Sequence, residues 1–366
     1  MSLRLKKNEE ILFALLRMAL HGQPVTDIDW KTVTEREWKE VYVVAAEQGV
    51  MALAWDGLQQ VMGLCALPRS LKITWGLAVR AYEERYERYC RTAAELSAFY
   101  QEQGIGMVQL KGVGFSTYYP IPAHREGGDI DIYTYSLDKE KRTDEEANRM
   151  ADELMRVQGI EVETDYFKHS SFYFQGIPIE NHKYFIATEN YMIAVPMNKL
   201  LHRLLTPVPA ELCGGEYRVM VPPPAFNALF LSFHAAQHFI FGFRIHHLFD
   251  WACLLKREGW CLPKEVTDEK LLDFICALTA LCNRLLGTEV PVKGGDHLVG
   301  KVYEQMMHPR YSEKIPVKGR WAVLWYKWKR MLHGQKMLRL IFDVSVTKRV
   351  MRSVWFHLKK PKSIWK

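Results

Sequence analysis

The chain has 366 residues, of which 48% are hydrophobic and 25% charged, a composition that excludes wholesale disorder. Its net charge of +7 is unevenly placed, because residues 313–366 contain 15 basic and 2 acidic residues, whereas the other 312 residues contain 34 basic and 40 acidic ones. The chain is therefore a slightly acidic body with a basic C-terminal tail, not a uniformly basic protein.

The first 104 residues have a helical pattern. Apolar residues recur at helical spacing from residue 8, and two further helices are predicted at 34–47 and 50–62. A long amphipathic helix is predicted at 71–103, where tyrosines and apolar residues share one stripe. Such a stripe is typical of a core or a domain interface, so residues 1–104 are expected to form an N-terminal helical region without chemistry of its own.

The pattern changes at Gly104. Short apolar runs near glycines predict strands at 106–110 and 129–135, followed by a charged amphipathic helix at 138–157. Three more strands are predicted at 160–164, 170–174 and 177–182, the last two joined by a tight turn at Gln175-Gly176. We expect residues 105–190 to form an α/β core with a small mixed sheet inside an α+β, predominantly helical protein.

After residue 190 the pattern is helical again. The predicted helices are 196–205, 223–241, 244–258 and 269–286, with an extended segment at 217–222. Glycines at 294, 295 and 300 indicate a loosening of structure before the tail. These patterns predict a helical lid or substrate region at 191–292 and a basic, tryptophan-rich helical tail at 293–366.

The cysteines and the apolar segments indicate in which cellular compartment the protein is found. Seven cysteines are scattered without a Cys-x-x-Cys pair, which argues against a disulfide framework or a structural zinc site and favours a reducing environment. The most apolar window, 225–243, contains His234, Gln237 and His238 and predicts a buried helix, not a membrane span. We expect a cytoplasmic protein with no transmembrane segment.

The densest carboxylate pattern is Gly127-Gly128-Asp129-Ile130-Asp131-Ile132. Alternate residues of a strand share a face, so Asp129 and Asp131 lie side by side. Adjacent carboxylates repel each other unless a cation lies between them, and Mg²⁺ prefers such oxygen ligands. Glu180, which shares a strand face with His182, offers the third carboxylate of a two-metal phosphoryl-transfer site. The alternative is a solvated strand edge with turn glycines before it.

Several further segments accompany this pattern: Leu110-Lys111-Gly112, Tyr119-Pro120, Arg125, Ile179-Glu180-Asn181-His182, and a helix pair with His234, His238, Arg244 and Leu248-Phe249-Asp250-Trp251. Together, over roughly residues 100–260, they resemble the uncharacterised nucleotidyltransferase family of the DNA polymerase β-like superfamily. In that superfamily a glycine turn cradles a nucleoside triphosphate, and acids on adjacent strands bind two Mg²⁺ ions, which Mn²⁺ can replace.

The resemblance implies the roles of individual residues. The catalytic and metal-binding residues would be Asp129, Asp131 and Glu180. The nucleotide, such as ATP, would be held by Lys111, Gly112, Arg125, Gly128, His182, His238 and Arg244. The family turn usually carries Gly-Ser or Gly-Gly, whereas Val113 follows Gly112 here. We therefore expect Lys111 and Arg125 to supply the charge at the phosphates.

A histidine pair on the helix at 223–241 has two interpretations. His234 and His238 are four residues apart and share one helix face, as in zinc proteases, but the catalytic Glu and a third ligand are missing from the pattern. We expect either buried, hydrogen-bonded side chains or, as the resemblance implies, a nucleotide-side lid in which His238 or Arg244 faces the base or triphosphate. His246 and His247 are expected to hydrogen bond locally near Asp250.

The basic tail carries Trp321, Trp325 and Trp328 at helical spacing among cationic residues, with a second cluster around Trp355. Three interpretations remain open: the tryptophans dock on the body, they contact a polyanion such as nucleic acid through residues 313–366, or they lie on an anionic membrane.

The sequence as a whole predicts a Mg²⁺-dependent nucleotidyltransferase that moves an NMP from an NTP to an unidentified acceptor and releases pyrophosphate. The alternatives are a catalytically inactive nucleotide- or RNA-binding module on the same polymerase β-like scaffold and, third, a purely structural scaffold.

Overall fold

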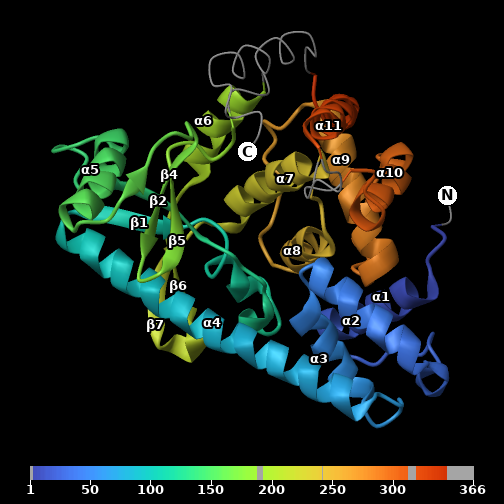
Figure 1. Ribbon diagram of the computed structural model, residues 1–366. Helices are drawn as coiled ribbons and strands as arrows, with labels where there is room; N and C mark the ends of the chain where they lie inside the picture. The colour runs from blue at the N-terminus through green and yellow to red at the C-terminus, as the bar shows by residue number, and fades with distance from the viewer. Residues whose placement is uncertain (1–2, 188–192, 241, 312–318, 344–366) are drawn as a thin grey trace.

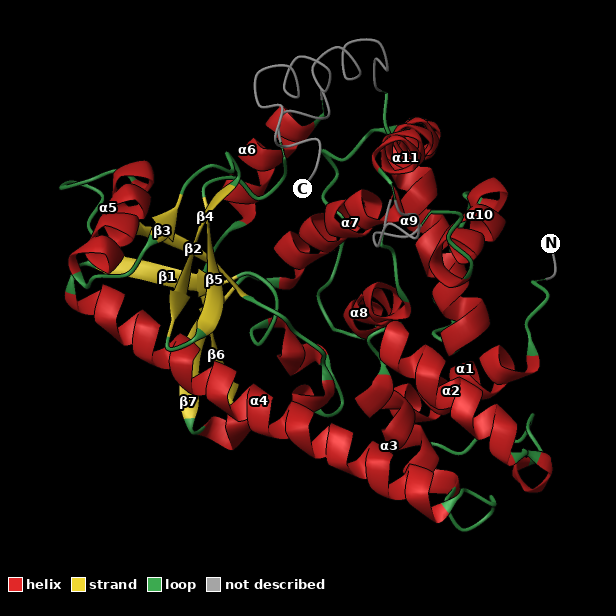
Figure 2. Ribbon diagram, viewed as in Figure 1, coloured by secondary structure: helices red, strands yellow, loops and turns green. Residues whose placement is uncertain are grey.

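The computed structural model describes residues 3–187, 193–240, 242–311 and 319–343 (Figure 1). Most of the described residues are helical, and the strands gather into one mixed sheet at one side of the molecule (Figure 2). The predicted α+β, predominantly helical class is confirmed. No helix among the described residues is long and apolar enough to cross a membrane.

The N-terminal helices confirm the pattern in the sequence, and their bounds are α1 (Lys7–His21), α2 (Glu35–Glu47), α3 (Met51–Val61) and α4 (Arg69–Glu102). Local chemistry sets some of these bounds. Thr34 caps α2, since its hydroxyl accepts the Glu37 amide while the Glu37 carboxylate accepts the Thr34 amide. The long helix α4 contributes Trp75 to the larger hydrophobic core and Leu96 to a second core beneath the sheet. The N-terminal region is thus packed on the rest of the chain.

The described residues form a sheet of seven strands in the order β3-β4-β5-β2-β1-β7-β6. The strands are β1 (Ile105–Gln109), β2 (Ile130–Ser136), β3 (Val162–Glu163), β4 (His169–Phe174), β5 (Ile177–His182), β6 (Val208–Leu212) and β7 (Tyr217–Val221). Strand β2 lies parallel to β5 and antiparallel to β1, so the sheet is mixed as predicted. The hairpin of β4 and β5 is also confirmed, with Gln175 and Gly176 both at positive φ in the turn.

Strand β6 was absent from the sequence prediction. It is an exposed edge strand that contains Pro209, so it shows no hydrophobic alternation. It pairs with β7, which itself lies parallel to β1. The sheet therefore includes residues 208–221, beyond the expected end of the α/β core at residue 190.

A buried polar network aligns β2, β4, β5 and α5 (Asp144–Val157). The Asn148 amide donates to Asn181 Oδ1 at 2.9 Å and to Thr134 Oγ1 at 3.0 Å, and the Asn181 amide donates to Asp152 at 2.9 Å. Ser170 completes the network by donating to Asp152. Since side chains alternate along a strand, locking Asn181 on one face fixes its neighbours Glu180 and His182 on the other.

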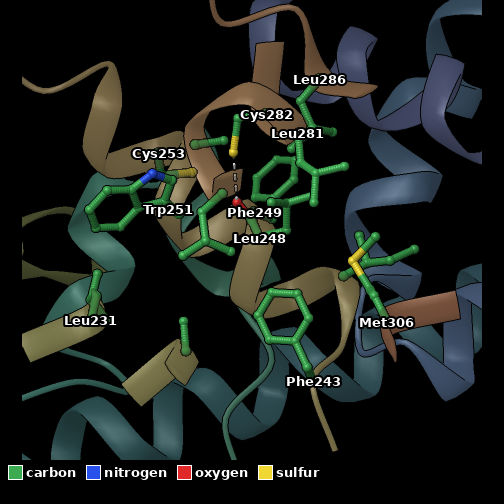
Figure 3. Close-up of a cluster of buried hydrophobic side chains, with 14 of the residues drawn as sticks. Leu231, Phe243, Leu248, Phe249, Trp251, Cys253, Leu281, Cys282, Leu286 and Met306 are labelled. Carbon is green, nitrogen blue, oxygen red and sulfur yellow. Dashed lines mark hydrogen bonds between the residues drawn. The ribbon is translucent and has the colours of Figure 1, made fainter. Parts of the chain in front are cut away.

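The helices after the sheet are α6 (Ala194–Leu204), α7 (Pro224–Ile240), α8 (Ile245–Leu255), α9 (Glu269–Leu281), α10 (Asp296–Met307) and α11 (Arg320–Ile341). Helix α8 lies in the larger core, where Phe249 and Trp251 are almost fully buried (Figure 3). A π turn at Cys282–Leu286 extends α9, and the Cys282 thiol lies 3.5 Å from the Leu248 carbonyl oxygen. The expected loosening at Gly300 is wrong, because this glycine lies inside α10.

The tail prediction has a divided outcome. In α11 the C-terminal residues Leu338 and Ile341 are buried in the larger core, whereas Trp321 is 84% exposed and Trp325 60% exposed. Docking of the tryptophan stripe on the body is therefore wrong for these side chains. The second cluster, around Trp355, lies outside the described residues.

Candidate active site

The candidate acids meet where β2 and β5 run side by side. The parallel register pairs Asp131 with Glu180, and Asp129 lies one residue before β2. Ligand atoms of Asp131, Glu180 and His182 lie within 4.8 Å of one another. Within the described chain this close group of three contains His182 in place of Asp129, which the sequence had put in the triad.

Asp131 is the centre of the group and has no exposed surface. His182 Nε2 lies 2.9 Å from its Oδ1, and Lys111 Nζ lies 3.1 Å from its Oδ2. Although burial acts in the opposite direction, Lys111 and His182 hold the pKa of Asp131 well below its usual value. The Lys111 contact is an ion pair without hydrogen-bond geometry, so the buried Oδ2 has no hydrogen-bond partner among the described residues.

Asp129 has the opposite electrostatic behaviour. Burial, followed by the negative charge of Asp131, raises its pKa to about 6, and Lys111 offsets only part of this effect. The carbonyl of Gly128, the residue before it, accepts the Tyr89 hydroxyl from α4 at 3.1 Å. Asp129 therefore ionises beside the charged Asp131 only at a cost in free energy, which a bound cation would relieve.

Glu180 is the most accessible member of the close group, with 28% of its side chain exposed. Its Oε2 lies 3.3 Å from Nε2 of His169, which sits at the start of β4. Sequence reasoning missed His169, although counting back from the Gln175-Gly176 turn places it opposite His182. The preceding residue, Lys168, was missed as well; burial and the charge of Lys111 lower its pKa to about 8.

The predicted phosphate turn follows β1. Gly112 has φ +64°, and a Cβ at this position would lie 3.2 Å from the Asp129 carbonyl oxygen, so the turn favours glycine. The Gly112 carbonyl accepts the Ser116 amide at 3.1 Å. The Leu110 amide, just before the turn, donates to the Asp131 carbonyl oxygen at 2.9 Å and holds the turn against β2, and Lys111 projects from it to the Asp131 side chain.

Arg125 forms a bidentate ion pair with Asp250 of α8. Its Nε lies 2.9 Å from Oδ1 and its Nη2 lies 2.8 Å from Oδ2. The Asp250 carboxylate also accepts the Tyr119 hydroxyl. The guanidinium fork expected to bind phosphate is thus engaged with a carboxylate and joins the turn region to α8. Its contact with a nucleotide remains a prediction.

A cavity of about 260 Å³ lies between the sheet and the helices. The sheet side contributes Lys111, Gly112 and Asp129, and the helix side contributes His238 and Arg244. Gly128, Arg125 and Asp250 also line it. The structure therefore brings most of the predicted nucleotide-binding residues to one space.

His182 is the exception. It is completely buried, with Nε2 directed at Asp131 and Nδ1 3.2 Å from the Tyr184 carbonyl oxygen. Contact of His182 with the nucleotide stays a prediction, and in the structure both of its ring nitrogens face other groups of the protein. Its contacts indicate that it orients Asp131.

Most of the chain matches a known protein family. The model of the uncharacterised nucleotidyltransferase family matches residues 34–287, more than half of the chain. The chain belongs to this family. No curated protein and no solved structure matches it. The match includes Asp129, Asp131, Glu180 and every cavity residue named above. The family resemblance seen in the sequence is confirmed.

The chemistry of the acid group fits a nucleotidyltransferase. Asp129, Asp131 and Glu180 offer hard oxygen ligands for a divalent ion, and the buried Asp131 Oδ2 makes no hydrogen bond with the part of the chain that the structure describes. Lys111 beside this oxygen can balance its charge in the absence of a metal and is also placed to contact a phosphate. The residues present fit a divalent cation at this position.

Proposed function

We propose that the protein is a Mg²⁺-dependent nucleotidyltransferase that moves an NMP from an NTP to an unidentified acceptor and releases pyrophosphate. The observation that carries the proposal is the pairing of Asp131 with Glu180 beside Asp129, with a buried carboxylate oxygen that makes no hydrogen bond in the described structure. Family membership supports the reaction class.

In the proposed reaction an acceptor oxygen attacks the α-phosphorus of the NTP, a new P–O bond forms, and the bond to the β-phosphate breaks. Bound Mg²⁺, or Mn²⁺ in its place, would be held by Asp129, Asp131 and Glu180 and would neutralise charge on the phosphates. Glu180 is the candidate to take the acceptor proton, because Asp131 is fully buried whereas Glu180 reaches solvent.

Binding of the triphosphate would depend on the cavity. The Gly112 turn allows close approach of the backbone, and Lys111 carries the positive charge next to the acids. From the helix side, His238 and Arg244 face the same space and are proposed to contact the base or the phosphates. Through its ion pair with Asp250, Arg125 is proposed to hold α8 against the Gly112 turn.

The proposed organisation follows these roles. Residues 105–190 carry the acids, 191–292 provide the helical lid together with the β6–β7 edge of the sheet, and 1–104 support both. Residues 293–366 are proposed as an accessory basic region that contacts a polyanion. All seven cysteines are unpaired in the structure, which supports the proposed cytoplasmic location.

The test is Mg²⁺-dependent binding of NTPs to the wild type and to an Asp129→Asn/Asp131→Asn variant, combined with a screen of labelled NTPs against acceptor extracts. We expect binding that requires Mg²⁺ and is lost in the variant, with label transfer in the wild type only. Mg²⁺-dependent binding without transfer to any acceptor would favour the inactive nucleotide-binding module. Binding that is equal in both proteins would refute the metal-binding role of the acids.

A further inference from the structure

Three histidines meet on the helix side of the cavity, apart from the acid group. His234 and His238 lie one turn apart on α7, and His247 lies near the start of α8. The ring centroids are 4.5 Å apart for His234 and His238, 4.4 Å for His238 and His247, and 5.3 Å for His234 and His247. One ring nitrogen from each residue lies within 4.8 Å of the other two.

Most of the ring nitrogens in this histidine cluster have no hydrogen-bond partner among the described residues. Within the described chain, neither ring nitrogen of His234 or His238 makes a hydrogen bond, and His247 makes one, in which Nδ1 accepts the Arg244 amide at 3.1 Å. The expected local hydrogen bonding of His246 and His247 is present, since His246 Nδ1 also lies 3.3 Å from the Gln48 carbonyl oxygen, while the nearby Asp250 carboxylate accepts from Arg125 and Tyr119. Three imidazoles thus share a polar space without satisfying one another.

The ligand type indicates which ion the cluster prefers. Imidazole nitrogen is a ligand for Zn²⁺ and related transition metals, whereas Mg²⁺ prefers oxygen. Zn–N bonds of about 2.0–2.1 Å in tetrahedral geometry place the nitrogens about 3.3 Å apart, so nitrogens already within 4.8 Å need only small side-chain rotations. The spacing of His234 and His238 on one helix face is well suited to a shared metal ion.

Positive charge lies near the cluster, since Lys111 adds to burial in lowering the pKa of all three histidines. Lys111, Arg125 and Arg244 line the cavity, but Glu126, Asp129 and Asp250 line it too. Burial lowers the pKa of His238 to about 3 and also lowers those of His234 and His247. The rings are therefore neutral, which is the form that binds metals.

We propose that His234, His238 and His247 bind a divalent transition metal ion of the Zn²⁺ type, with the fourth coordination position open to the cavity that Lys111 and Asp129 line from the opposite side. Three protein ligands with one open position are typical of metal sites that bind water or a ligand atom. The open position would receive a donor atom of a molecule in the cavity.

Metal binding at His247 has a local consequence. In the metal-free protein Nδ1 accepts the Arg244 amide, so the neutral ring carries its proton on Nε2. A neutral ring that binds a metal through one nitrogen carries its proton on the other, and it can no longer accept that amide. The Arg244 amide at the start of α8 should therefore exchange its hydrogen faster when the metal is bound.

The first test is a titration of chelator-treated protein with Co²⁺ in excess Mg²⁺, followed by the visible absorption of four-coordinate Co²⁺. We expect one equivalent to bind in the wild type, and the affinity to fall at least about 100-fold in His238→Ala and in His247→Gln. His297→Ala removes a largely exposed histidine at the start of α10 and should bind Co²⁺ as the wild type does.

A second measurement uses the wild type alone, so that misfolding of a variant cannot decide the result. X-ray absorption of the Zn²⁺-loaded protein should show three imidazole nitrogens at about 2.0–2.1 Å. An Asp131→Asn/Glu180→Gln variant should still bind metal at the three histidines even if it loses Mg²⁺-dependent NTP binding. The result for the histidine site is therefore independent of the result for the proposed function. Unchanged Co²⁺ affinity in His238→Ala, or a zinc shell dominated by oxygen, would overturn the proposal.

Discussion

Replacing Asp129 with Asn should stabilise the metal-free protein while removing its response to Mg²⁺. The pKa of Asp129 is about 6 in the folded protein, against an ordinary value of 3.8. Between these values the folded protein binds the proton more tightly than the unfolded chain does, so the free energy of unfolding falls as the pH rises through this window. At neutral pH the ionised Asp129 therefore costs stability, and Asn does not.

The magnitude follows from the two pKa values. Each pH unit between them corresponds to about 1.4 kcal/mol, so the gain from Asp129→Asn has an upper bound of roughly 3 kcal/mol at pH 7 and about half of that at pH 5. Partial access of solvent to the side chain reduces both values. In the presence of Mg²⁺ the wild type should be more stable than Asp129→Asn, because metal binding stabilises the wild type and not the variant.

The assay is urea unfolding at pH 5, 6 and 7, in chelator and in Mg²⁺, for the wild type and Asp129→Asn. Asp165→Asn, which removes an exposed carboxylate of the loop before β4, is the matched control and should change little. A variant that is no more stable than the wild type at pH 7 in chelator, or a gain that is as large at pH 5 as at pH 7, would refute the reasoning.

Three further predictions concern the contacts around the acids. Lys111→Met leaves Asp131 buried without its cationic partner and should cost about 2–4 kcal/mol in urea unfolding, part of which Mg²⁺ restores; no cost would mean that the ion pair is unimportant. Gly112→Ala places a side chain on a residue with φ +64°, which should lower the free energy of unfolding by about 1 kcal/mol and weaken NTP binding about 10-fold. Calorimetry measures the binding, and unchanged affinity would argue against a phosphate turn. Arg125→Met and Asp250→Asn should each cost about 3 kcal/mol, and the double variant clearly less than their sum; additive losses in the double-mutant cycle would show that the pair is not coupled.

Local chemistry explains which parts of the fold could be predicted from sequence. The β4–β5 hairpin was found because Gln175-Gly176 marks its turn, and the turn fixes which residues pair. Helix α10 lies inside the predicted helical tail, but its bounds could not be predicted because Gly300 resembles a break, and packing of Leu298 and Val302 in the larger core holds the helix together there. Tertiary packing of this kind is not visible in a local pattern.

The same limit applies to the site. Alternation along each strand predicts which face carries Asp131 and which face carries Glu180, but it does not predict that the two strands are neighbours. The parallel pairing of β2 with β5 brings the two carboxylates together. The third histidine was missed for a similar reason. His247 is nine residues from His238 and belongs to the next helix, so its approach depends on the turn at Gly242 and on the packing of α7 against α8.

Helix α4 runs unbroken from one hydrophobic core to the other. Its 34 residues span about 50 Å, with Trp75 in the larger core, Leu96 in the second, and Tyr86 beside the Gly112 turn between them. Insertion of a single residue between the two cores would rotate one set of contacts by about 100° relative to the other. The number of residues between the two cores is therefore constrained by the helix geometry. Single-residue insertions that surface loops tolerate should be selected against in this stretch.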